Sequence, residues 1–329
     1  MKEFLKILSE RKHLKREEAK ALILLMTSGK ADVNLIASIL TAYHFLSPNL
    51  DEIKGFRAAL YERCLSIDLS EFQPMDLCGT GGDGKDTINI STLSAFVVSS
   101  CGYPIAKHGN YGSSSICGSS NILEYLGYRF KHSEEELKTE LDRNQLCFIH
   151  APLFHPCLKQ VAPVRKALGI KTFFNLLGPL VNPCRPKIQS SGVFNLDVMR
   201  QYHYLLQESH EKHSIVYSMD GYDEVSLTGK FKLLTTHGEQ VLHPNDLDLL
   251  TVKKEDIKGG SNIKESAEIF LKILQGKGSS KQNSVIAINS AIAMQCYDSS
   301  KSIQHYYEDA SDCLLSGKPY QKLRKTIYA

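Results

Sequence analysis

The sequence predicts an α/β protein with a small N-terminal helical domain and a larger α/β domain whose central mixed sheet is flanked by helices. Two observations support this class. Up to about residue 68 apolar residues recur at helical spacing, whereas beyond Pro74 strand and helix signals alternate. That alternation is typical of a central α/β sheet. We therefore place a helical domain at 1–68 and an α/β domain at 72–329, with the boundary near Asp68–Pro74.

Four helices are expected in the first domain, and their ends carry recognisable signals. They open at Phe4–Leu8, run over Glu17–Ser28, follow Asp32, and extend from Asn49 toward Cys64. Gly29 suits the left-handed residue that often follows a helix. Asp32 is a favourable N-cap, and Asn49 with Glu52 three residues later forms a capping-box pattern.

The second domain is expected to alternate strands with helices. The predicted strands are Met75–Cys78, Tyr103–Lys107, Leu146–His150, Gly192–Phe194, Ser214–Met219 and a hairpin over Lys230–Val241, with helices after Ser91 and at Asn121–Leu126. Ala151–Pro156 is expected to be a loop after the third strand. The charged, glycine-containing stretch Val252–Lys264 is expected to be an exposed connection.

The composition argues against several function classes. A formal charge of +3 and a pI near 8.2 are too mild for the concentrated basic surface of a nucleic-acid-binding domain. Nine cysteines without a Cys-x-x-Cys pair predict neither a disulfide framework nor a zinc site, and they favour a reducing compartment. No run approaches the roughly 18 apolar residues of a membrane span, and the acid-containing N-terminus is unlike a secretory signal. We expect a cytoplasmic protein that binds neither nucleic acid nor a membrane.

The most informative segment is the glycine-rich turn after the first predicted strand. Its glycines are Gly79, Gly81, Gly82 and Gly84. Such density permits positive φ values and a close approach of a ligand to the backbone amides. Asn89, Ser91 and Thr92 then add polar side chains at the entrance of a helix, where the dipole favours an anion. A phosphate-binding loop is the preferred hypothesis, and a plain tight turn is the alternative.

The turn does not fit either common nucleotide-binding motif. Lys85 is followed by Asp86 rather than by the Ser or Thr of a Walker A motif. Gly79–Gly84 has the glycine spacing of a dinucleotide fingerprint, but Gly102–Lys107, about 20 residues further on, contains no acid to hold a ribose. Asp83 would repel a pyrophosphate unless a cation lay between them. The pattern therefore favours a magnesium-complexed phosphate.

A second polar loop follows the next predicted strand. It reads Lys107, His108, Gly109, Asn110, Tyr111, Gly112, Ser113, Ser114 and Ser115, and continues to Gly118, Ser119, Ser120 and Asn121. A lysine, backbone amides and hydroxyl groups suit an anion, while the alternative is a merely solvated serine-rich loop. Because ligands bind at the carboxyl ends of strands in open α/β sheets, both loops are expected to belong to one site.

Two further features have both a structural and a functional interpretation. Arg165 lies beside the apolar stripe of a predicted helix over Val161–Gly169, and an exposed arginine there needs no function. Asp223 and Glu224 follow an apolar run. Such adjacent acids are usually solvated, yet their hard oxygen atoms also suit Mg²⁺.

Together these motifs resemble the anthranilate phosphoribosyltransferase family of tryptophan biosynthesis. The matching segments are GTGGDG from Gly79, NIST over Asn89–Thr92, KHGN over Lys107–Asn110, VAPVRKALG over Val161–Gly169, FNLLGPLVNP over Phe174–Pro183, and the Asp223-Glu224 pair. They keep the family's order over roughly residues 1–230. GTGGDG or KHGN alone would also fit the pyrimidine nucleoside phosphorylases of the same fold.

The resemblance implies transfer of the 5-phosphoribosyl group from phosphoribosyl pyrophosphate to anthranilate with release of pyrophosphate, the second step of tryptophan synthesis from chorismate. It assigns phosphoribosyl pyrophosphate to Gly79, Gly82, Asp83, Thr87, Asn89, Ile90, Ser91, Thr92, Lys107, His108, Gly109, Asn110, Tyr111, Gly112, Ser113, Ser114, Ser115 and Ser119. It assigns anthranilate to Gly79, His108, Asn110, His155 and Arg165, with Arg165 on the carboxylate, and Mg²⁺, two ions per subunit, to Ser91, Asp223 and Glu224. A homodimer is implied, as are helices from about 155–180 that join the helical domain.

One position departs from the family pattern. The family usually continues KHGN with Arg, and Tyr111 here removes a guanidinium that could hold pyrophosphate, so we expect altered affinity rather than lost function. His108 and His155 are possible general bases, but contacts with the aromatic substrate are the preferred role for both, and stabilisation of the leaving group by Lys107 and magnesium is expected to carry the reaction. The alternatives are a pyrimidine nucleoside phosphorylase and a non-catalytic nucleic-acid-binding relative of the same fold.

Overall fold

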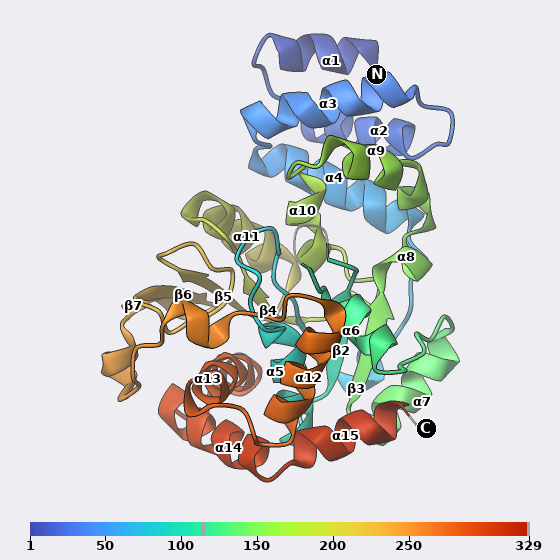
Figure 1. Cartoon of the computed structure of the whole chain (residues 1–329). Coiled ribbons are helices and arrows are strands. Elements are labelled where there is room, and N and C mark those ends of the chain that lie inside the picture. The colour runs from blue at the N-terminus through green and yellow to red at the C-terminus, as the bar shows by residue number, and fades with distance from the viewer. Residues whose placement is uncertain (113–115, 328–329) are drawn as a thin grey trace. The chain divides into compact units, whose positions relative to one another are not determined.

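The computed structural model describes residues 1–112 and 116–327. The chain folds into two compact units, formed by Met1–Ile67 with Ala151–Arg185 and by Asp68–His150 with Pro186–Ala329. Within the described residues the first unit is a helical bundle, and the second is built on a seven-stranded mixed sheet with helices around it (Figure 1). The predicted fold class is confirmed.

The first unit consists of short and medium helices. They are α1 (Lys2–Ser9), α2 (Arg16–Met26), α3 (Val33–Leu46), α4 (Leu50–Arg63), α8 (Ala151–Phe154), α9 (Ala162–Leu168) and α10 (Phe174–Leu177), with 3-10 turns η2 (Pro156–Gln160) and η3 (Gly178–Leu180). Both predicted caps are confirmed. Asp32 accepts a hydrogen bond from the amide two residues on at 2.7 Å, and Asn49 and Glu52 form the reciprocal capping box.

The buried carboxylate of Glu52 joins several parts of this bundle. It accepts hydrogen bonds from the hydroxyl of Tyr43 and from the backbone amides of Leu14 and Asn49, each at 2.8 Å. Because a buried carboxylate needs donors for its oxygen atoms, these contacts fix the start of α4 against α3 and the segment before α2.

The returning segment of the first unit adds aromatic packing. Phe173 stacks on Phe56 of α4 with ring centroids 4.4 Å apart. The prediction of a loop at Ala151–Pro156 was wrong, because this stretch forms α8 and begins η2. Ala151 and Phe154, three residues apart, are both buried, so helical winding places them on one inward face.

The sheet of the second unit has the strand order β3-β2-β1-β4-β5-β6-β7. Its strands are β1 (Met75–Leu77), β2 (Ile105–Gly109), β3 (Leu146–His150), β4 (Ile188–Gly192), β5 (Lys212–Ser218), β6 (Phe231–Thr235) and β7 (Gly238–Leu242). The first five strands in this order run parallel to one another. Strand β6 runs antiparallel to β5, and β7 runs antiparallel to β6. The predicted hairpin over Lys230–Val241 is confirmed as β6 and β7.

Strand β4 begins four residues before the predicted strand Gly192–Phe194, so that placement was wrong. The sequence of β4 is polar although all five of its residues are buried. Its polar groups pair inside the sheet, since Ser214 Oγ donates to Ser190 Oγ at 2.8 Å and Gln189 Nε2 donates to Ser191 Oγ at 3.0 Å. Because β4 is polar, its sequence lacks the apolar run by which buried strands are usually recognised.

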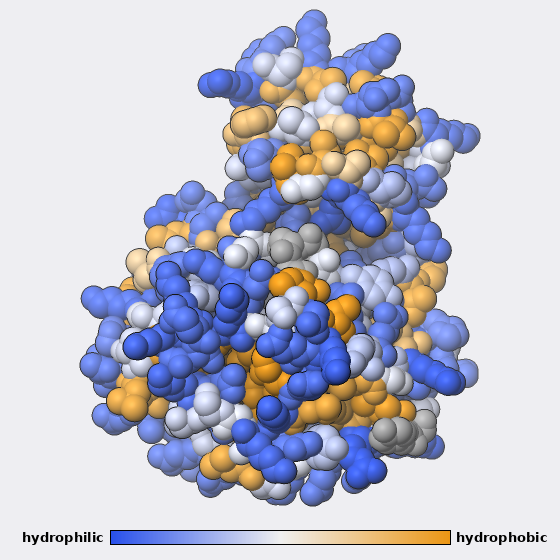
Figure 2. Space-filling model, in the orientation of Figure 1, coloured by the Kyte–Doolittle hydropathy of each residue, from blue (hydrophilic) through white to orange (hydrophobic). Residues whose placement is uncertain are grey.

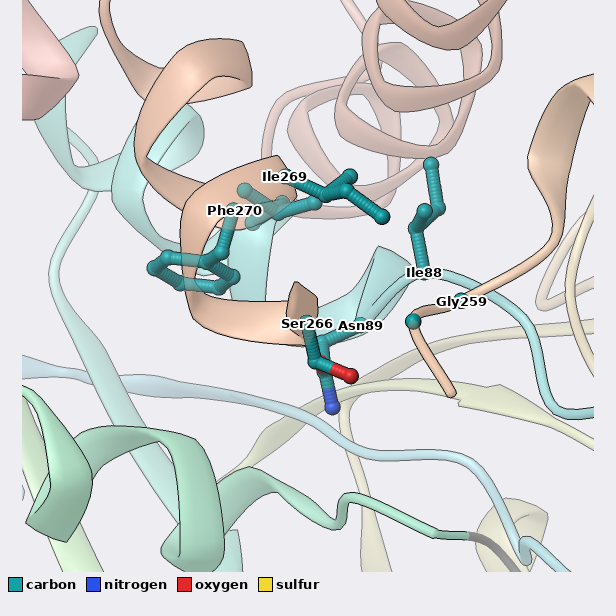
Figure 3. Close-up of a pocket in the computed structure, with 8 residues that line it drawn as sticks. Ile88, Asn89, Gly259, Ser266, Ile269 and Phe270 are labelled. Atoms are coloured by element: carbon teal, nitrogen blue, oxygen red, sulfur yellow. The ribbon is translucent and has the colours of Figure 1, made fainter. Parts of the chain in front are cut away.

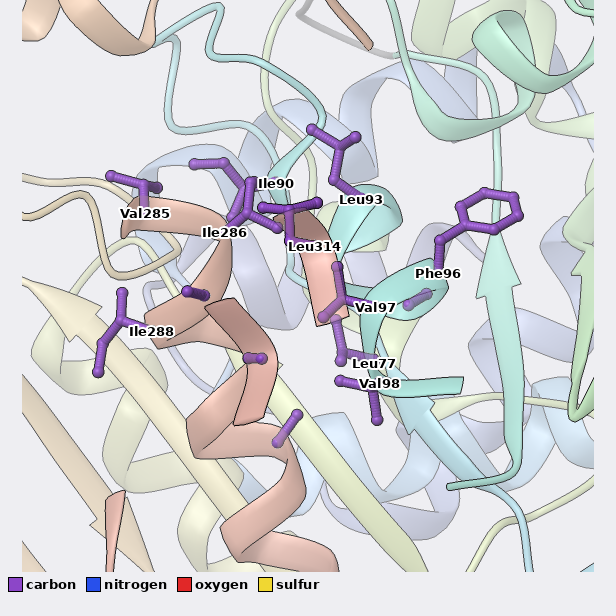
Figure 4. Packing of buried hydrophobic residues seen from close by; sticks show 14 of the residues in the cluster. Leu77, Ile90, Leu93, Phe96, Val97, Val98, Val285, Ile286, Ile288 and Leu314 are labelled. Carbon is purple, nitrogen blue, oxygen red and sulfur yellow. The ribbon is translucent and has the colours of Figure 1, made fainter. Parts of the chain in front are cut away.

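Helices surround the sheet in the second unit. They are α5 (Ile90–Ser100), α6 (Ser119–Tyr125), α7 (Glu134–Asn144), α11 (Leu196–Ser209), α12 (Ile263–Leu274), α13 (Ser280–Tyr297), α14 (Ile303–Leu315) and α15 (Lys318–Ile327), with 3-10 turns η1 (Ser70–Phe72), η4 (Pro244–Leu247) and η5 (Lys254–Ile257). Helix α5 is buried along most of its length. Its Val97 lies toward Leu314 of α14 in a core that also contains Ile286 of α13, while Phe96 points away from these residues (Figure 4). This packing holds the N-terminal end of α5 rigidly, and that end carries Ser91.

Lys322 of α15 caps the C-terminal ends of two helices. Its ammonium group donates to the carbonyls of Ser99, at the end of α5, and Asn144, at the end of α7, at 2.7 and 2.6 Å. The last carbonyls of a helix lack partners within that helix and favour a cation. Burial lowers the pKa of Lys322 to about 8.

Glu140 of α7 provides a test of the packing in this unit. The carboxyl group is buried and accepts a hydrogen bond from Tyr128 Oη at 2.6 Å, and burial raises its pKa to about 7. The folded state therefore keeps a proton that the unfolded state loses, and stability falls as the pH rises from about 4.5 through 7. We expect Glu140→Gln to raise the free energy of unfolding at pH 8 by about 2–3 kcal/mol, and to change it little at pH 4.5.

Urea unfolding at the two pH values measures this effect. Glu135→Gln, an exposed position on the same helix, is the matched control and should show no such pH-dependent gain. Equal effects of both substitutions at both pH values would contradict the conclusion that burial raises the pKa of Glu140.

On the face drawn in Figure 2, each unit has hydrophilic side chains with apolar side chains interspersed among them. Among the described residues, no helix combines the length and the apolar character needed to cross a membrane.

Candidate functional site

Three loops of the second unit meet beyond the carboxyl ends of its parallel strands. The first loop follows β1, the second follows β2, and the third, residues 219–225, follows β5. Ser91 N, at the start of α5, donates to Glu224 Oε1 at 3.1 Å, and Asn89 Nδ2 donates to the carbonyl of Cys117 at 2.9 Å. These bonds join the first loop to the third and to the second.

The first loop uses its glycines as the sequence predicts. Gly81, Gly82 and Gly84 have φ values of 63°, 74° and 73°, in the left-handed region that favours glycine. Gly79 serves a different purpose, because a Cβ atom built there would lie 2.6 Å from Asp223 Oδ2. Asp223 Oδ2 also accepts a hydrogen bond from Gly81 N at 2.6 Å. The loop is thus wrapped closely around this carboxylate.

The close approach at Gly79 gives a testable expectation. Gly79→Ala forces the Asp223 carboxylate or the loop to move, and we expect the free energy of unfolding to fall by about 1–3 kcal/mol. A Cβ atom at Gly229 meets nothing within 4 Å, so Gly229→Ala is the matched control. Chemical denaturation measures both variants. Equal stability of Gly79→Ala and Gly229→Ala would show that the contact with Asp223 does not constrain residue 79.

Three acidic side chains gather where the first and third loops meet. Asp223 is buried, and its pKa rises to about 7 because of burial and the nearby charge of Asp83. Burial, together with the charges of Asp223 and Asp83, raises the pKa of Glu224 well above its usual value. Burial likewise raises the pKa of Asp83. Asp223 is thus buried rather than solvated, and Glu224 is half-buried.

This acidic group fits a hard divalent cation. Within residues 1–112 and 116–327, there is no group of three or more His, Cys, Asp or Glu side chains placed so that they could hold a metal ion by themselves. Mg²⁺ does not need one, because it commonly binds through one or two carboxylates together with water and phosphate oxygens. A cation next to Asp223 and Glu224 would relieve the repulsion that raises their pKa values.

Lys107 supplies a positive charge near these acids. The residue is buried in β2, and its ammonium group donates to the carbonyl of Leu77 and to Ser91 Oγ, the latter at 3.3 Å. The neighbouring His108 is also buried, and its backbone amide donates to Asp76 Oδ1 at 3.0 Å. Strand β2 therefore holds both side chains at the edge from which the second loop departs.

The second loop is fixed by Asn121, which lies outside the predicted site, and by Ser119, which belongs to it. Asn121 Oδ1 accepts from Gly112 N at 2.9 Å and from Gly118 N at 3.0 Å, which joins the two ends of the loop. Ser119 Oγ donates to the carbonyl of Asn110 at 3.2 Å. Gly109 allows this packing, since a Cβ atom there would lie 2.7 Å from Ser119 Oγ. The predicted ligands Ser113, Ser114 and Ser115 lie outside the described residues.

Tyr111, the residue that departs from the family pattern, is turned toward α6. Its hydroxyl donates to Glu124 Oε1 at 2.8 Å, and its ring meets the His150 ring edge-on with centroids 4.9 Å apart. A neutral phenol held in this way cannot replace the charge of a guanidinium. The second loop therefore has its cation at Lys107 and none at position 111.

The remaining predicted phosphate ligands lie on the first loop and at the start of α5. Thr87 forms an isolated antiparallel bridge with Lys258, and Ile88 N donates to the carbonyl of Ile257 at 2.9 Å. Ile90 and Thr92 are buried in α5. The prediction of an exposed connection at Val252–Lys264 is confirmed for much of the segment, as at Lys253 and Lys254, but the segment also contains η5, buries Ile257 and supports the first loop.

A further contact of the first loop was not predicted. The ammonium group of Lys85 lies over the Tyr222 ring, 4.9 Å from its centroid. Tyr222 directly precedes Asp223, so this contact draws the glycine-rich turn toward the third loop. The spacing of a basic residue in one loop and an aromatic residue in another gives no signal in the sequence, because only the fold brings them together.

The predicted anthranilate ligands Arg165 and His155 belong to the first unit. Arg165 is half-buried in α9, with its guanidinium 5.3 Å from the centroid of the Phe174 ring and Nη2 donating weakly to Asn175 Oδ1 at 3.5 Å. Burial lowers its pKa. His155 is buried, its Nε2 donates to the carbonyl of Val181 at 2.8 Å, and burial lowers its pKa to about 4.

Both units resemble domains of known protein families. A family model described as the α/β domain of a glycosyl transferase family matches residues 71–320, and the model of the helical bundle domain of such a family matches residues 2–64. Anthranilate phosphoribosyltransferase of Cytophaga hutchinsonii is 44% identical over 327 residues, covering 99% of this chain and 100% of that protein. The Flavobacterium psychrophilum protein of the same name is 47% identical over 325 residues, covering 99% and 98%.

Solved structures agree with these matches. The crystal structure of anthranilate phosphoribosyltransferase from Thermus thermophilus has a TM-score of 0.89 and 29% identity, with 98% of each chain covered. The Saccharomyces cerevisiae enzyme in complex with PRPP and Mg has a TM-score of 0.89 and 25% identity, with 99% of this chain and 96% of that chain covered.

Proposed function

Because the chain belongs to the anthranilate phosphoribosyltransferase family, we propose that it transfers the 5-phosphoribosyl group of phosphoribosyl pyrophosphate to the amine of anthranilate. The products are N-(5-phosphoribosyl)anthranilate and pyrophosphate, and the reaction is the second step of tryptophan synthesis from chorismate. The single observation that carries the proposal is the acidic group of Asp83, Asp223 and Glu224, enclosed by the glycine-rich turn beside Lys107.

The first and second loops would hold the diphosphate. The left-handed glycines permit a close approach of the diphosphate to the backbone of the first loop, and the N-terminal end of α5 favours an anion. Lys107, already fixed against Ser91 Oγ, offers its charge to the departing pyrophosphate. Mg²⁺, held by Asp223, Glu224 and Ser91, would neutralise negative charge on the diphosphate. Two ions per subunit are part of this proposal.

Arg165 would hold the carboxylate of anthranilate. A planar guanidinium pairs with a carboxylate through two parallel hydrogen bonds, and packing over the Phe174 ring limits the rotation of the side chain. Asn175 flanks the same guanidinium. Because the contact with Asn175 Oδ1 is long, a substrate carboxylate can readily take its place.

The chemistry requires little help from a base. The aromatic amine of anthranilate is neutral at pH 7, so it can attack the ribose carbon without prior deprotonation. His155, with its pKa lowered to about 4 and its Nε2 engaged by a carbonyl, is neutral at that pH and suited to contact an aromatic substrate. Catalysis then depends on orientation of the two substrates and on stabilisation of the leaving group.

Support for both substrates comes from the relatives. One S. cerevisiae structure is described as a complex with PRPP and Mg and another as a complex with 4-fluoroanthranilate. We further propose that the chain acts as a homodimer in the cytoplasm, and that its two compact units, the helical one including residues 151–185, are two functional domains.

Product analysis tests the proposed function against its rivals. Incubation with phosphoribosyl pyrophosphate, anthranilate and Mg²⁺ should yield a product with the mass of phosphoribosylanthranilate and an equal amount of pyrophosphate. A pyrimidine nucleoside phosphorylase would instead release free base from uridine or thymidine with inorganic phosphate. A non-catalytic nucleic-acid-binding relative would give neither product and would bind oligonucleotides.

A further inference from the structure

The carboxylate of Asp86 connects the two loops proposed to bind the diphosphate. Its Oδ1 atom accepts a hydrogen bond from the backbone amide of Ile116, in the second loop, at 3.1 Å. Its own carbonyl accepts from Gly259 N at 2.7 Å. Asp86 thus contacts both the second loop and the segment after η5, while lying in the first loop.

The bond from Asp86 is one of two that fix the same short stretch. Asn89 Nδ2 donates to the carbonyl of Cys117 at 2.9 Å, so side chains of the first loop engage the amide of one residue and the carbonyl of the next. Two bonds of opposite direction on adjacent residues define both the position and the orientation of that stretch. The second loop is therefore anchored where it returns toward α6.

The backbone of Asp86 is held in an uncommon conformation by its surroundings. Its φ is 45°, a left-handed value that only a few per cent of residues other than glycine adopt. The segment after η5 packs tightly against this turn, since a Cβ atom at Gly259 would lie 2.8 Å from the carbonyl oxygen of Thr87. In Figure 3, Ile88 and Asn89 lie close to Gly259 and to Ser266 of α12, and together they line a small pocket. This packing fixes the direction in which the Asp86 carboxylate points.

We propose that Asp86 is a positioning residue for binding of phosphoribosyl pyrophosphate, an inference that rests on the proposed function. Its carboxylate acts through the amide of Ile116, and it touches neither the substrate nor the cation. The hydrogen bond holds the second loop against the first so that the amides and hydroxyls of both loops face one diphosphate. A carboxylate in this place would by itself repel an anion, so its contribution must come from the acceptor atom rather than from the charge.

Two substitutions separate the acceptor from the charge. Asn and Gly both accept a left-handed backbone, so neither Asp86→Asn nor Asp86→Gly is strained at φ 45°. Asn keeps an oxygen acceptor for Ile116 N and removes the charge, whereas Gly removes both. We expect Asp86→Gly to raise the KM for phosphoribosyl pyrophosphate about 5-fold, the effect of one lost hydrogen bond. The KM for anthranilate should change less, and Asp86→Asn should stay within about 2-fold of wild type for both substrates.

Hydrogen exchange of the free protein provides a readout independent of turnover. Backbone amides in a peptide that includes residues 116–118 should exchange faster in Asp86→Gly than in wild type or Asp86→Asn. Asp248→Gly is the matched control, because Asp248 is exposed and also has a left-handed φ, 57°, at the end of η4. It should change neither the KM nor the exchange of that peptide.

Several outcomes would overturn the proposal. Equal rises in KM for Asp86→Asn and Asp86→Gly would show that the charge, not the acceptor, matters. Unchanged KM and exchange in Asp86→Gly would show that the bond does not order the loop. If the wild-type chain shows no transferase activity, the proposed function fails, while a faster exchange confined to Asp86→Gly would still establish the connection between the loops.

Discussion

The double substitution Asp223→Asn with Glu224→Gln should abolish activity and at the same time make the magnesium-free protein more stable. Both acids accept hydrogen bonds from backbone amides where the loops meet. Both have raised pKa values because of burial, which is complete for Asp223 and partial for Glu224, and because of the nearby charge of Asp83. Loss of the charges that hold Mg²⁺ and stabilise the leaving group should reduce kcat at least about 1,000-fold, in the range seen when electrostatic stabilisation is removed.

The effect on stability has the opposite sign. A carboxyl group whose pKa is raised in the folded state stabilises the fold below its unfolded pKa, and this contribution is lost as the pH rises through the folded value, about 7 for Asp223. At pH 8 the wild-type fold therefore carries repelling charges that the amide variant lacks. We expect a gain on the order of 2 kcal/mol in the free energy of unfolding at pH 8, and little difference near pH 4.

Thermal or urea unfolding with a chelator measures the stability, and rate against Mg²⁺ concentration measures the activity. Each single variant should need more Mg²⁺ for half-maximal rate, since fewer negative ligands weaken cation binding. A double variant with full activity at low Mg²⁺ would contradict the metal assignment. An unchanged or lowered stability at pH 8 would contradict the account of mutually repelling buried charges.

Arg165→Ala should raise the KM for anthranilate far more than that for phosphoribosyl pyrophosphate. The guanidinium is half-buried over Phe174, so a carboxylate that pairs with it is largely removed from water. Loss of such a pair corresponds to about 2–4 kcal/mol, or roughly 30- to 1,000-fold in kcat/KM for anthranilate. Arg165→Lys should recover only part of this, because an ammonium group cannot form two parallel bonds.

Lys166→Ala is the matched control for Arg165. Lys166 is the next residue of α9 and is exposed, so its loss removes a positive charge at nearly the same place without removing the stacked guanidinium. It should leave both KM values within about 2-fold of wild type. A normal anthranilate KM for a folded Arg165→Ala protein would exclude Arg165 from the substrate site.

Helix caps are short-range signals, and the helix starts that they specify are predicted correctly from the sequence. The caps at Asp32 and Asn49 specify where α3 and α4 begin, and both are found as predicted. Helix α7 is absent from the predicted elements because its sequence is mostly charged, with Leu137 and Leu141 as its buried apolar residues. The capping box of Ser133 with Glu136 was a usable signal for it.

Other features depend on contacts between distant residues. Strand β4 is polar and is recognisable only through pairing with its two neighbours. The segment after Val252 is charged, yet its Ile257 is buried in the core, and the backbone of Lys258 pairs with that of Thr87. The glycine-rich turn is visible in the sequence, whereas the closure of that turn around a carboxylate some 140 residues further along the chain is set by the fold.

The most direct measurement for the central claim is the fluorescence of anthranilate during incubation with the purified chain. We expect the fluorescence to decay only when phosphoribosyl pyrophosphate and Mg²⁺ are both present, and to stay constant with the double variant Asp223→Asn/Glu224→Gln. No decay with folded wild-type protein at saturating substrates, or the same decay without phosphoribosyl pyrophosphate, would contradict the proposed transfer reaction.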